Sequence, residues 1–148
     1  DDDPATTPGV GWDEVESLAE AAVRDGVPLR LTIDPRVRSA PVELTASVHR
    51  ILAESLTNVR RHARDVTLVD ASVELEGSGP GAAVVVRVHD DGLGSVAPTH
   101  DTYGLVGMGE RADALGGSLF AGPAPSGGWL VHASFPVEAA AVSQDSIR

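Results

Sequence analysis

The chain has 148 residues, of which 42% are hydrophobic and 22% are charged, and its formal net charge is −11. This composition fits one globular domain with a core of its own, and the excess of acid excludes the basic face of a nucleic-acid-binding domain. The sequence contains no cysteine and no lysine. Disulfides, cysteine-ligated zinc and phosphate sites built on a lysine are therefore excluded.

The first half of the chain is predicted to form two helices and one strand. Because the chain begins with Asp1 and not Met, we expect it to be a piece of a longer protein. The pattern predicts a polar linker at residues 1–9, a short helix at 12–24, a strand at 27–33, a turn at 34–41 and a long amphipathic helix from about Val42 to Ala63.

The second half is predicted to be mostly strands. We expect strands at 66–75 and 82–90, a glycine-rich loop at 91–107, a short helix at 108–115, a closing hairpin at 118–121 and 129–135, and a polar tail at 138–148. Helices gathered on one face of a mixed, mostly antiparallel sheet would satisfy this order. The predicted fold class is therefore α/β (α+β), a two-layer sandwich, with one domain at 10–137.

Three polar side chains on the long helix are candidates for metal and phosphate binding. At about 100° per residue, Glu54, Asn58 and Arg61 fall within about 60° of one another, beside apolar Ile51. An Asn oxygen suits Mg²⁺, a Glu could handle a metal-bound water, and an Arg could meet phosphate. The alternative is a polar helix edge, which this helix alone would favour.

A carboxylate at the end of a predicted strand is a candidate base reader. Asp90 shares the parity of Val84, Val86 and Val88, so it should point towards the apolar side of its strand. A buried carboxylate needs donors, and the N6 amino group of adenine would provide one. Gly92 and Gly94 would let a flat base approach the backbone, although a simple Asp-Gly turn is the alternative.

The glycine-rich stretch "YGLVGMGERADALGG" is a candidate anion site. Gly104, Gly107 and Gly109 precede or open the predicted helix, where free N–H groups attract phosphate. The GxxGxG spacing differs from the dinucleotide-binding GxGxxG. Alone, this stretch is more typical of a flexible loop that needs glycine.

The order and spacing of these three motifs resemble the catalytic ATP-binding domain of bacterial sensor histidine kinases, the fold shared with DNA gyrase B, Hsp90 and MutL. "HRILAESLTNVRRHA" resembles the N box, "DDGLG" the G1 box and "GLVGMGERADALGGSL" the G2 box of that family. The G2 form resembles the subfamily whose response regulators carry a helix-turn-helix output domain of the nitrate-regulator type.

The resemblance implies a role for each site residue. Asn58 would bind Mg²⁺, Glu54 would handle a metal-bound water, and Arg61 and His62 would contact phosphate. Asp90 would read adenine above Gly92 and Gly94. The G2 box would contribute Gly104, Leu105, Gly107 and Met108 to nucleotide binding.

Two departures from the family pattern accompany these matches. Gly109 stands where the subfamily usually has Arg, and Trp129 stands where many relatives have a Thr near the adenine. Neither removes a core ligand.

The resemblance implies an ATP-dependent protein histidine kinase domain that uses ATP and Mg²⁺. Its expected partners are the histidine-bearing dimerisation domain of the parent kinase and a response regulator, with no nucleic acid and no direct membrane contact. We expect a cytoplasmic domain, and a membrane-anchored parent stays open. The alternatives are a serine kinase of the anti-sigma-factor type and a nucleotide-binding module without catalysis.

Overall fold

The computed structural model of the protein describes residues 11–93 and 107–137 in full and residues 102–106 by their helical backbone. This part of the chain forms three α-helices and five strands. They are α1 (Trp12–Arg24), β1 (Leu29–Ile33), α2 (Val42–His62), β2 (Val69–Glu76), β3 (Ala83–Asp90), α3 (Thr102–Ala114), β4 (Ser118–Pro123) and β5 (Trp129–Pro136), with short 3-10 turns at Pro35–Ser39 and Gly79–Gly81.

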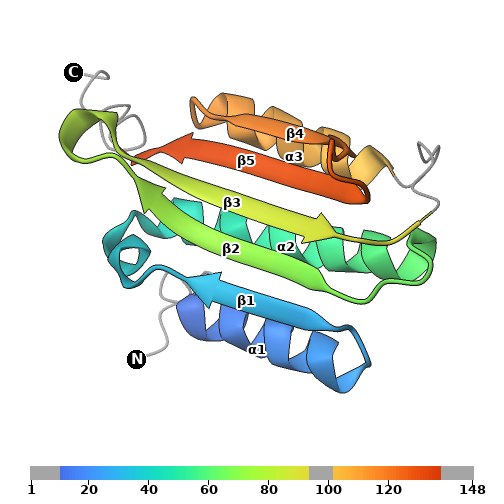
Figure 1. The fold of residues 1–148 in the computed structure, drawn as a ribbon. Coiled ribbons are helices and arrows are strands. Elements are labelled where there is room, and N and C mark those ends of the chain that lie inside the picture. The colour runs from blue at the N-terminus through green and yellow to red at the C-terminus, as the bar shows by residue number, and fades with distance from the viewer. Residues whose placement is uncertain (1–10, 94–101, 138–148) are drawn as a thin grey trace.

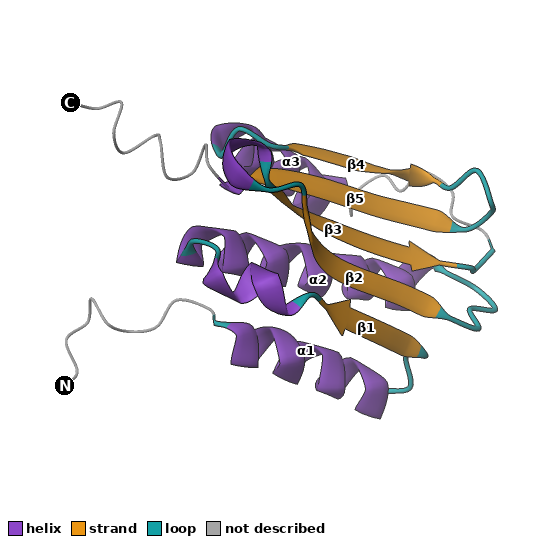
Figure 2. Ribbon diagram, turned by 60° about the vertical axis from the view of Figure 1, so that its left-hand side comes forward, coloured by secondary structure: helices purple, strands orange, loops and turns teal. Residues whose placement is uncertain are grey.

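The five strands form one mixed sheet in the order β1-β2-β3-β5-β4. β1 pairs with β2 in parallel, and the other three pairs are antiparallel. All three helices lie on the same face of the sheet, and no helix of the described residues covers the other, open face (Figures 1 and 2). The predicted fold class is therefore confirmed. Within the described ranges, no helix has the length and apolar character needed to cross a bilayer.

The hydrophobic core lies between the sheet and the helices. The strand residues of one parity point into it, including Val84, Val86 and Val88 on β3 and Val131 and Phe135 on β5. α2 supplies the opposite wall through the buried residues Leu44, Val48, Ile51, Leu52, Leu56 and Val59. This agrees with the alternation expected of a half-buried strand and the spacing expected of an amphipathic helix.

β2 begins three residues later than the pattern predicted. The strand was expected from residue 66, but the ladder starts where Val69 pairs with Asp90. The backbone N–H groups of Thr67 and Leu68 donate to the carboxylate of Asp91 instead of to a neighbouring strand. A side chain therefore takes the hydrogen bonds that would have extended the strand.

α3 begins six residues earlier than the pattern predicted, so Gly104 and Gly107 lie inside the helix and not in a loop before it. Glycine disfavours a helix interior by about 1 kcal/mol relative to alanine, which is why the pattern predicts a later start. Contacts of α3 with α2 and β4 offset this cost. The predicted stop is confirmed, since Gly116 has φ of 80° and the N–H of Gly117 donates to Ala112 at 2.7 Å.

Candidate nucleotide-binding site

The predicted metal- and phosphate-binding residues lie on the last three turns of α2. Glu54, Asn58 and His62 are half-buried and Arg61 is exposed, as expected for residues along the edge of the buried helix face. The C-terminal end of this helix, the C-terminal end of β3 and the beginning of α3 lie at the same end of the molecule (Figure 1). The fold thus gathers all three motifs at one end of the sheet.

Asp90 is the buried carboxylate at this end of the sheet. It is 3% exposed, which confirms its inward parity. Its Oδ1 accepts a hydrogen bond from the Gly92 N–H at 2.9 Å, and no further donor to this carboxylate is found among the described residues. Burial raises the pKa of Asp90 above its ordinary value, and the bond from Gly92 partly opposes this. The carboxylate therefore retains acceptor capacity for another polar group.

Gly92 lets the turn after β3 lie directly against the end of α2. A Cβ at Gly92 would stand 2.7 Å from Val66 Cγ2, 3.0 Å from Ala63 Cβ and 3.0 Å from the Arg64 carbonyl oxygen. Glycine is therefore required here by close packing of the chain. Gly94 lies outside the described residues.

The predicted phosphate-gripping residues are found at the beginning of α3. Gly104 and Leu105 belong to its first turns. A Cβ at Gly107 would meet nothing within 4 Å, so this position faces open space. Met108 is buried in the core, and it lines a small cavity with Ile51 and Phe135. Its contact with a nucleotide stays a prediction.

Sequence reasoning missed Gly128, which lies directly against the backbone of Asp90. Its φ is 78°, and a Cβ there would come within 1.8 Å of the Asp90 carbonyl oxygen. The glycine pair 127–128 predicted a hairpin turn, but the contact with β3 arises only from the β3–β5 pairing. The next residue, Trp129, pairs with Asp90 in that ladder.

The chain is similar to three curated histidine kinases. It is 39% identical over 90 residues to the sensor histidine kinase YxjM of Bacillus subtilis, covering 60% of this chain and 21% of the relative. It is 32% identical over 110 residues to the nitrate/nitrite sensor protein NarQ of Escherichia coli, covering 72% and 19%. It is 28% identical over 97 residues to the histidine-protein kinase/phosphatase DegS of Brevibacillus brevis, covering 66% and 24%.

This chain is a catalytic domain of the sensor histidine kinase family. No family model matches it. The domain spans about a fifth to a quarter of the length of these relatives. The nitrate sensor among them agrees with the predicted subfamily.

Solved histidine kinase structures share the fold of this kinase domain. A blue-light activated histidine kinase from Erythrobacter litoralis matches with a TM-score of 0.64 at 18% identity, over 85% of this chain and 41% of that one. The histidine kinase AdeS from Acinetobacter baumannii matches with a TM-score of 0.56 at 16% identity, over 86% of this chain and 65% of that one. At these identities the likeness establishes the fold alone.

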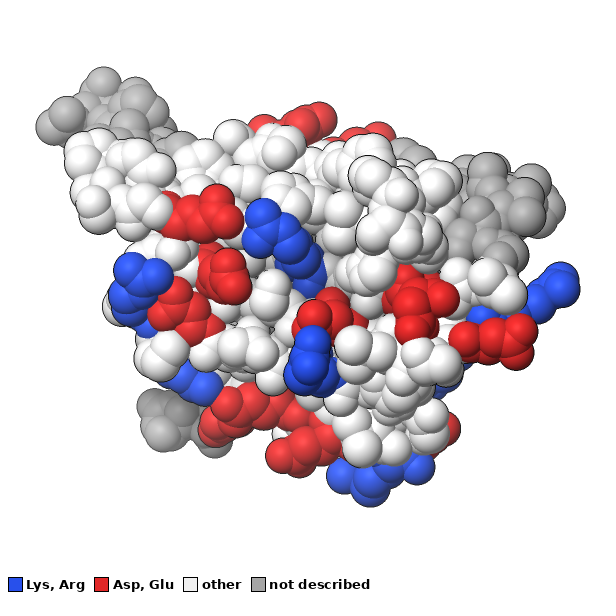
Figure 3. All heavy atoms as spheres, in the orientation of Figure 1, with Lys and Arg blue, Asp and Glu red and all other residues white. Residues whose placement is uncertain are grey.

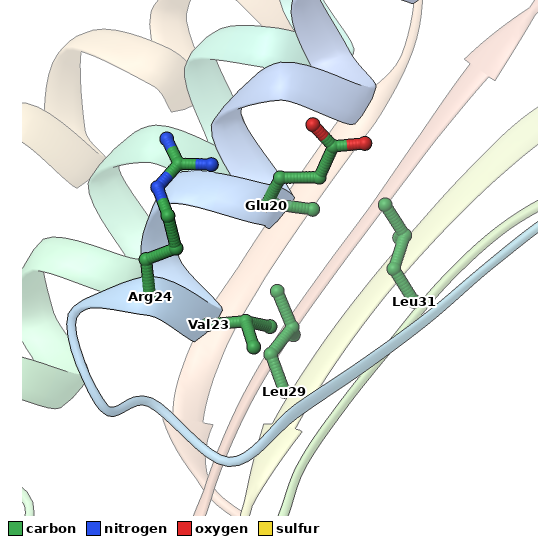
Figure 4. A pocket seen from close by; sticks show the side chains of 6 residues that line it. Glu20, Val23, Arg24, Leu29 and Leu31 are labelled. Atoms are coloured by element: carbon green, nitrogen blue, oxygen red, sulfur yellow. The ribbon is translucent and has the colours of Figure 1, made fainter.

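Two hollows of the histidine kinase domain lie away from the motif residues. An open apolar groove of about 330 Å³ runs between α1 and the edge strand β1, lined in part by Val23, Leu29 and Leu31 (Figure 4). A second hollow lies on the open face of the sheet, lined in part by Arg30, Asp70 and Arg87, and acidic and basic side chains are interspersed on this face (Figure 3). Ion pairs such as Arg30–Asp70, 3.0 Å apart, lie there. None of the predicted site residues lines either hollow.

Proposed function

We propose that this domain binds Mg²⁺ and ATP between the end of β3, the last turns of α2 and the beginning of α3, and that it donates the γ-phosphoryl group to a histidine on a separate dimerisation domain. A response regulator with a helix-turn-helix output domain would then receive the group. Because ATP is a cytoplasmic substrate, we place this activity in the cytoplasm.

The observation that carries the proposal is the buried carboxylate of Asp90. It faces the helix side of the sheet, is desolvated, and has one described donor, the Gly92 N–H. An adenine N6 amino group would supply a second donor, which offsets the cost of burying the charge. The half-buried ring of Trp129, opposite Asp90 in the ladder, would offer the base an apolar neighbour.

The last turns of α2 carry side chains that suit the phosphate end of ATP. Asn58 offers a neutral oxygen to Mg²⁺, and Arg61 offers a fixed positive charge to phosphate oxygens. Glu54 lies one turn before Asn58, where it could orient a metal-bound water. Within the described ranges, no cluster of three or more His, Asp or Glu side chains forms a metal site. Mg²⁺ shares phosphate oxygens and keeps several waters while it neutralises phosphate charge.

A transfer assay tests this function directly. Incubation of the domain with γ-labelled ATP is expected to leave the domain unlabelled, because a histidine within the walls of the site cannot easily reach the in-line position about 3 Å from the phosphorus. Addition of the dimerisation domain of the parent kinase should transfer label to that domain. Acid-labile label on this chain alone would contradict the two-domain arrangement, and transfer to a serine of an anti-sigma antagonist would favour the serine kinase alternative.

The Asp90→Asn variant is expected to lose adenine recognition. An amide is a weaker acceptor than a carboxylate, and it can turn a donor towards the N6 amino group. A hydrogen bond to a charged group contributes about 1.5–3 kcal/mol, so ATP affinity should fall by about tenfold to a hundredfold. Calorimetric titration with ATP and GTP measures this. Equal affinities for ATP and GTP in the unmodified domain would rule out Asp90 as the base reader.

The same variant is expected to raise the thermal stability of the unliganded domain at pH 7. Because the pKa of Asp90 is raised in the folded state, its ionisation at neutral pH stabilises the unfolded chain relative to the folded one. The amide of the variant has no charge to desolvate, so the melting temperature of the variant should be the higher. The difference should shrink as the pH falls through the folded pKa towards the unfolded value of about 3.9.

A further inference from the structure

We propose that Asp91 is a positioning residue that holds the turn after β3, which carries Gly92, and the end of α2 together as one unit. We propose that Asp91 thereby sets the preference of the site for adenine. The inference rests on the proposed nucleotide site. It assigns a role to the second carboxylate of the "DDGLG" motif, to which sequence reasoning gave none.

Asp91 binds the segment between α2 and β2 through three donors. Its Oδ1 accepts the backbone N–H groups of Thr67 at 2.8 Å and Leu68 at 3.1 Å, and its Oδ2 accepts the Thr67 hydroxyl. The Thr67 hydroxyl and then the backbone donors hold the pKa of Asp91 below its ordinary value. The carboxylate is therefore ionised at neutral pH, and its acceptor sites face this one segment.

The backbone on both sides of Asp91 is attached to the same segment. The Asp91 N–H donates to the Leu68 carbonyl oxygen at 3.3 Å, and Arg64 and Leu93 exchange two backbone hydrogen bonds of 3.1 and 2.8 Å. Between these two attachments lies Gly92, packed against Ala63 and Val66. The residues that follow His62 and the residues that follow Asp90 thus form one closed unit.

This unit holds the Gly92 N–H in place, which is the one donor to the Asp90 carboxylate among the described residues. Adjacent residues leave the chain on opposite sides, so Asp90 points inward and Asp91 points outward to the segment at the end of α2. The Gly92 N–H that orients the Asp90 carboxylate belongs to the very next residue. When a substitution removes the Asp91 carboxylate, the N–H groups of Thr67 and Leu68 can donate to water instead. The fold should therefore survive, while the turn that carries Gly92 becomes less well held.

A pair of substitutions separates positioning from charge. Asp91→Ala removes all three bonds. Asp91→Asn keeps an Oδ1 for both backbone donors and turns an amide N–H₂ towards the Thr67 hydroxyl, whose oxygen can accept. Asp70→Ala serves as the control, because Asp70 is an Asp on the open face whose carboxylate pairs with Arg30 away from the site.

The readout is the ratio of the dissociation constants for GTP and ATP, measured by calorimetry at saturating Mg²⁺ together with the melting temperature. We expect Asp91→Ala to lower this ratio by about tenfold, the value of one charge-assisted hydrogen bond, and Asp91→Asn and Asp70→Ala to change it by less than about twofold. If Asp91 had a purely structural role, the substitution would reduce the fraction of the domain that can bind nucleotide. The affinities for ATP and GTP would then fall equally, and the ratio of the two dissociation constants would stay unchanged.

An unchanged ratio in Asp91→Ala, or an equal fall in Asp70→Ala, would overturn the inference while leaving the proposed function intact. Absence of any ATP preference in the unmodified domain would overturn the proposed base reading, and this inference with it. If Asp91→Ala does not fold, the Thr67→Val variant tests the inference, because it removes only the hydrogen bond from the Thr67 hydroxyl to Asp91. A fall in the ratio with an unchanged melting temperature supports the inference, and an unchanged ratio contradicts it.

Discussion

Replacing Asn58 by alanine is expected to abolish the Mg²⁺-dependent part of ATP binding and to lower phosphoryl transfer to the dimerisation domain by about a hundredfold or more. The side-chain oxygen of Asn58 is the proposed protein ligand of the metal, and phosphoryl transfer depends on positioning and on neutralising phosphate charge. The fold should change little, because Asn58 lies at the half-buried edge of α2 and alanine is a better helix former.

Titration with ATP in EDTA and in excess Mg²⁺ separates metal binding from a general loss of affinity. Thr57→Ala is the matched control, since Thr57 is the half-buried neighbour on the same helix and its hydroxyl donates to the Ala53 carbonyl oxygen at 2.9 Å. The control should keep the full Mg²⁺ enhancement. If Asn58→Ala kept it as well, the polar stripe on α2 would be an ordinary helix edge.

Replacing Gly128 by alanine is expected to destabilise the domain by about 3 kcal/mol or more and to lower its melting temperature by roughly 10 °C. The added Cβ would stand 1.8 Å from the Asp90 carbonyl oxygen, and this is a backbone atom at the end of β3, where β3 pairs with β5. Either β3 or β5 must shift, and Asp90 would shift with them. ATP affinity should therefore fall in addition to stability.

Gly127→Ala is a matched control for this effect. Gly127 also has positive φ, 101°, so an alanine there is strained by about 1–2 kcal/mol, but its Cβ would meet nothing within 4 Å. Thermal unfolding of the two variants measures the contribution of the clash alone. Equal melting temperatures would show that the hairpin accommodates a side chain at Gly128 without moving β3.

The long helix and the strands could be predicted because their patterns are local. α1 has the expected bounds, and α2 ends within one residue of the prediction. The inward direction of Asp90 also follows from a local rule, since side chains alternate along any strand. Val85 departs from this rule, because it lies on the open side of β3 and is still 2% exposed. Its register partners are Glu74 on β2 and Ser134 on β5, and alternation along one strand says nothing of the neighbours that pairing places beside a side chain.

The beginning of α3 could not be predicted, because local preference and tertiary packing disagree there. Three glycines within the first eight residues disfavour a helix, yet contacts with α2 and β4 outweigh them. The late start of β2 has a similar cause. The N–H groups of Thr67 and Leu68 find an acceptor on Asp91, which lies 24 and 23 residues further along the chain.

By itself the sequence determined which residues form the candidate site: the stripe of Glu54, Asn58 and Arg61, the inward carboxylate of Asp90 and the glycine-rich G2 box. The stripe and the inward carboxylate depend on the periods of helix and strand, and the G2 box depends on the spacing of its glycines, all of which are properties of residues near one another in the chain. Only the tertiary structure decided how these parts are held. The attachment of Asp91 to the segment after α2, and the approach of Gly128 to within van der Waals range of Asp90, join residues far apart in the chain, and such contacts follow from the packing of the whole sheet.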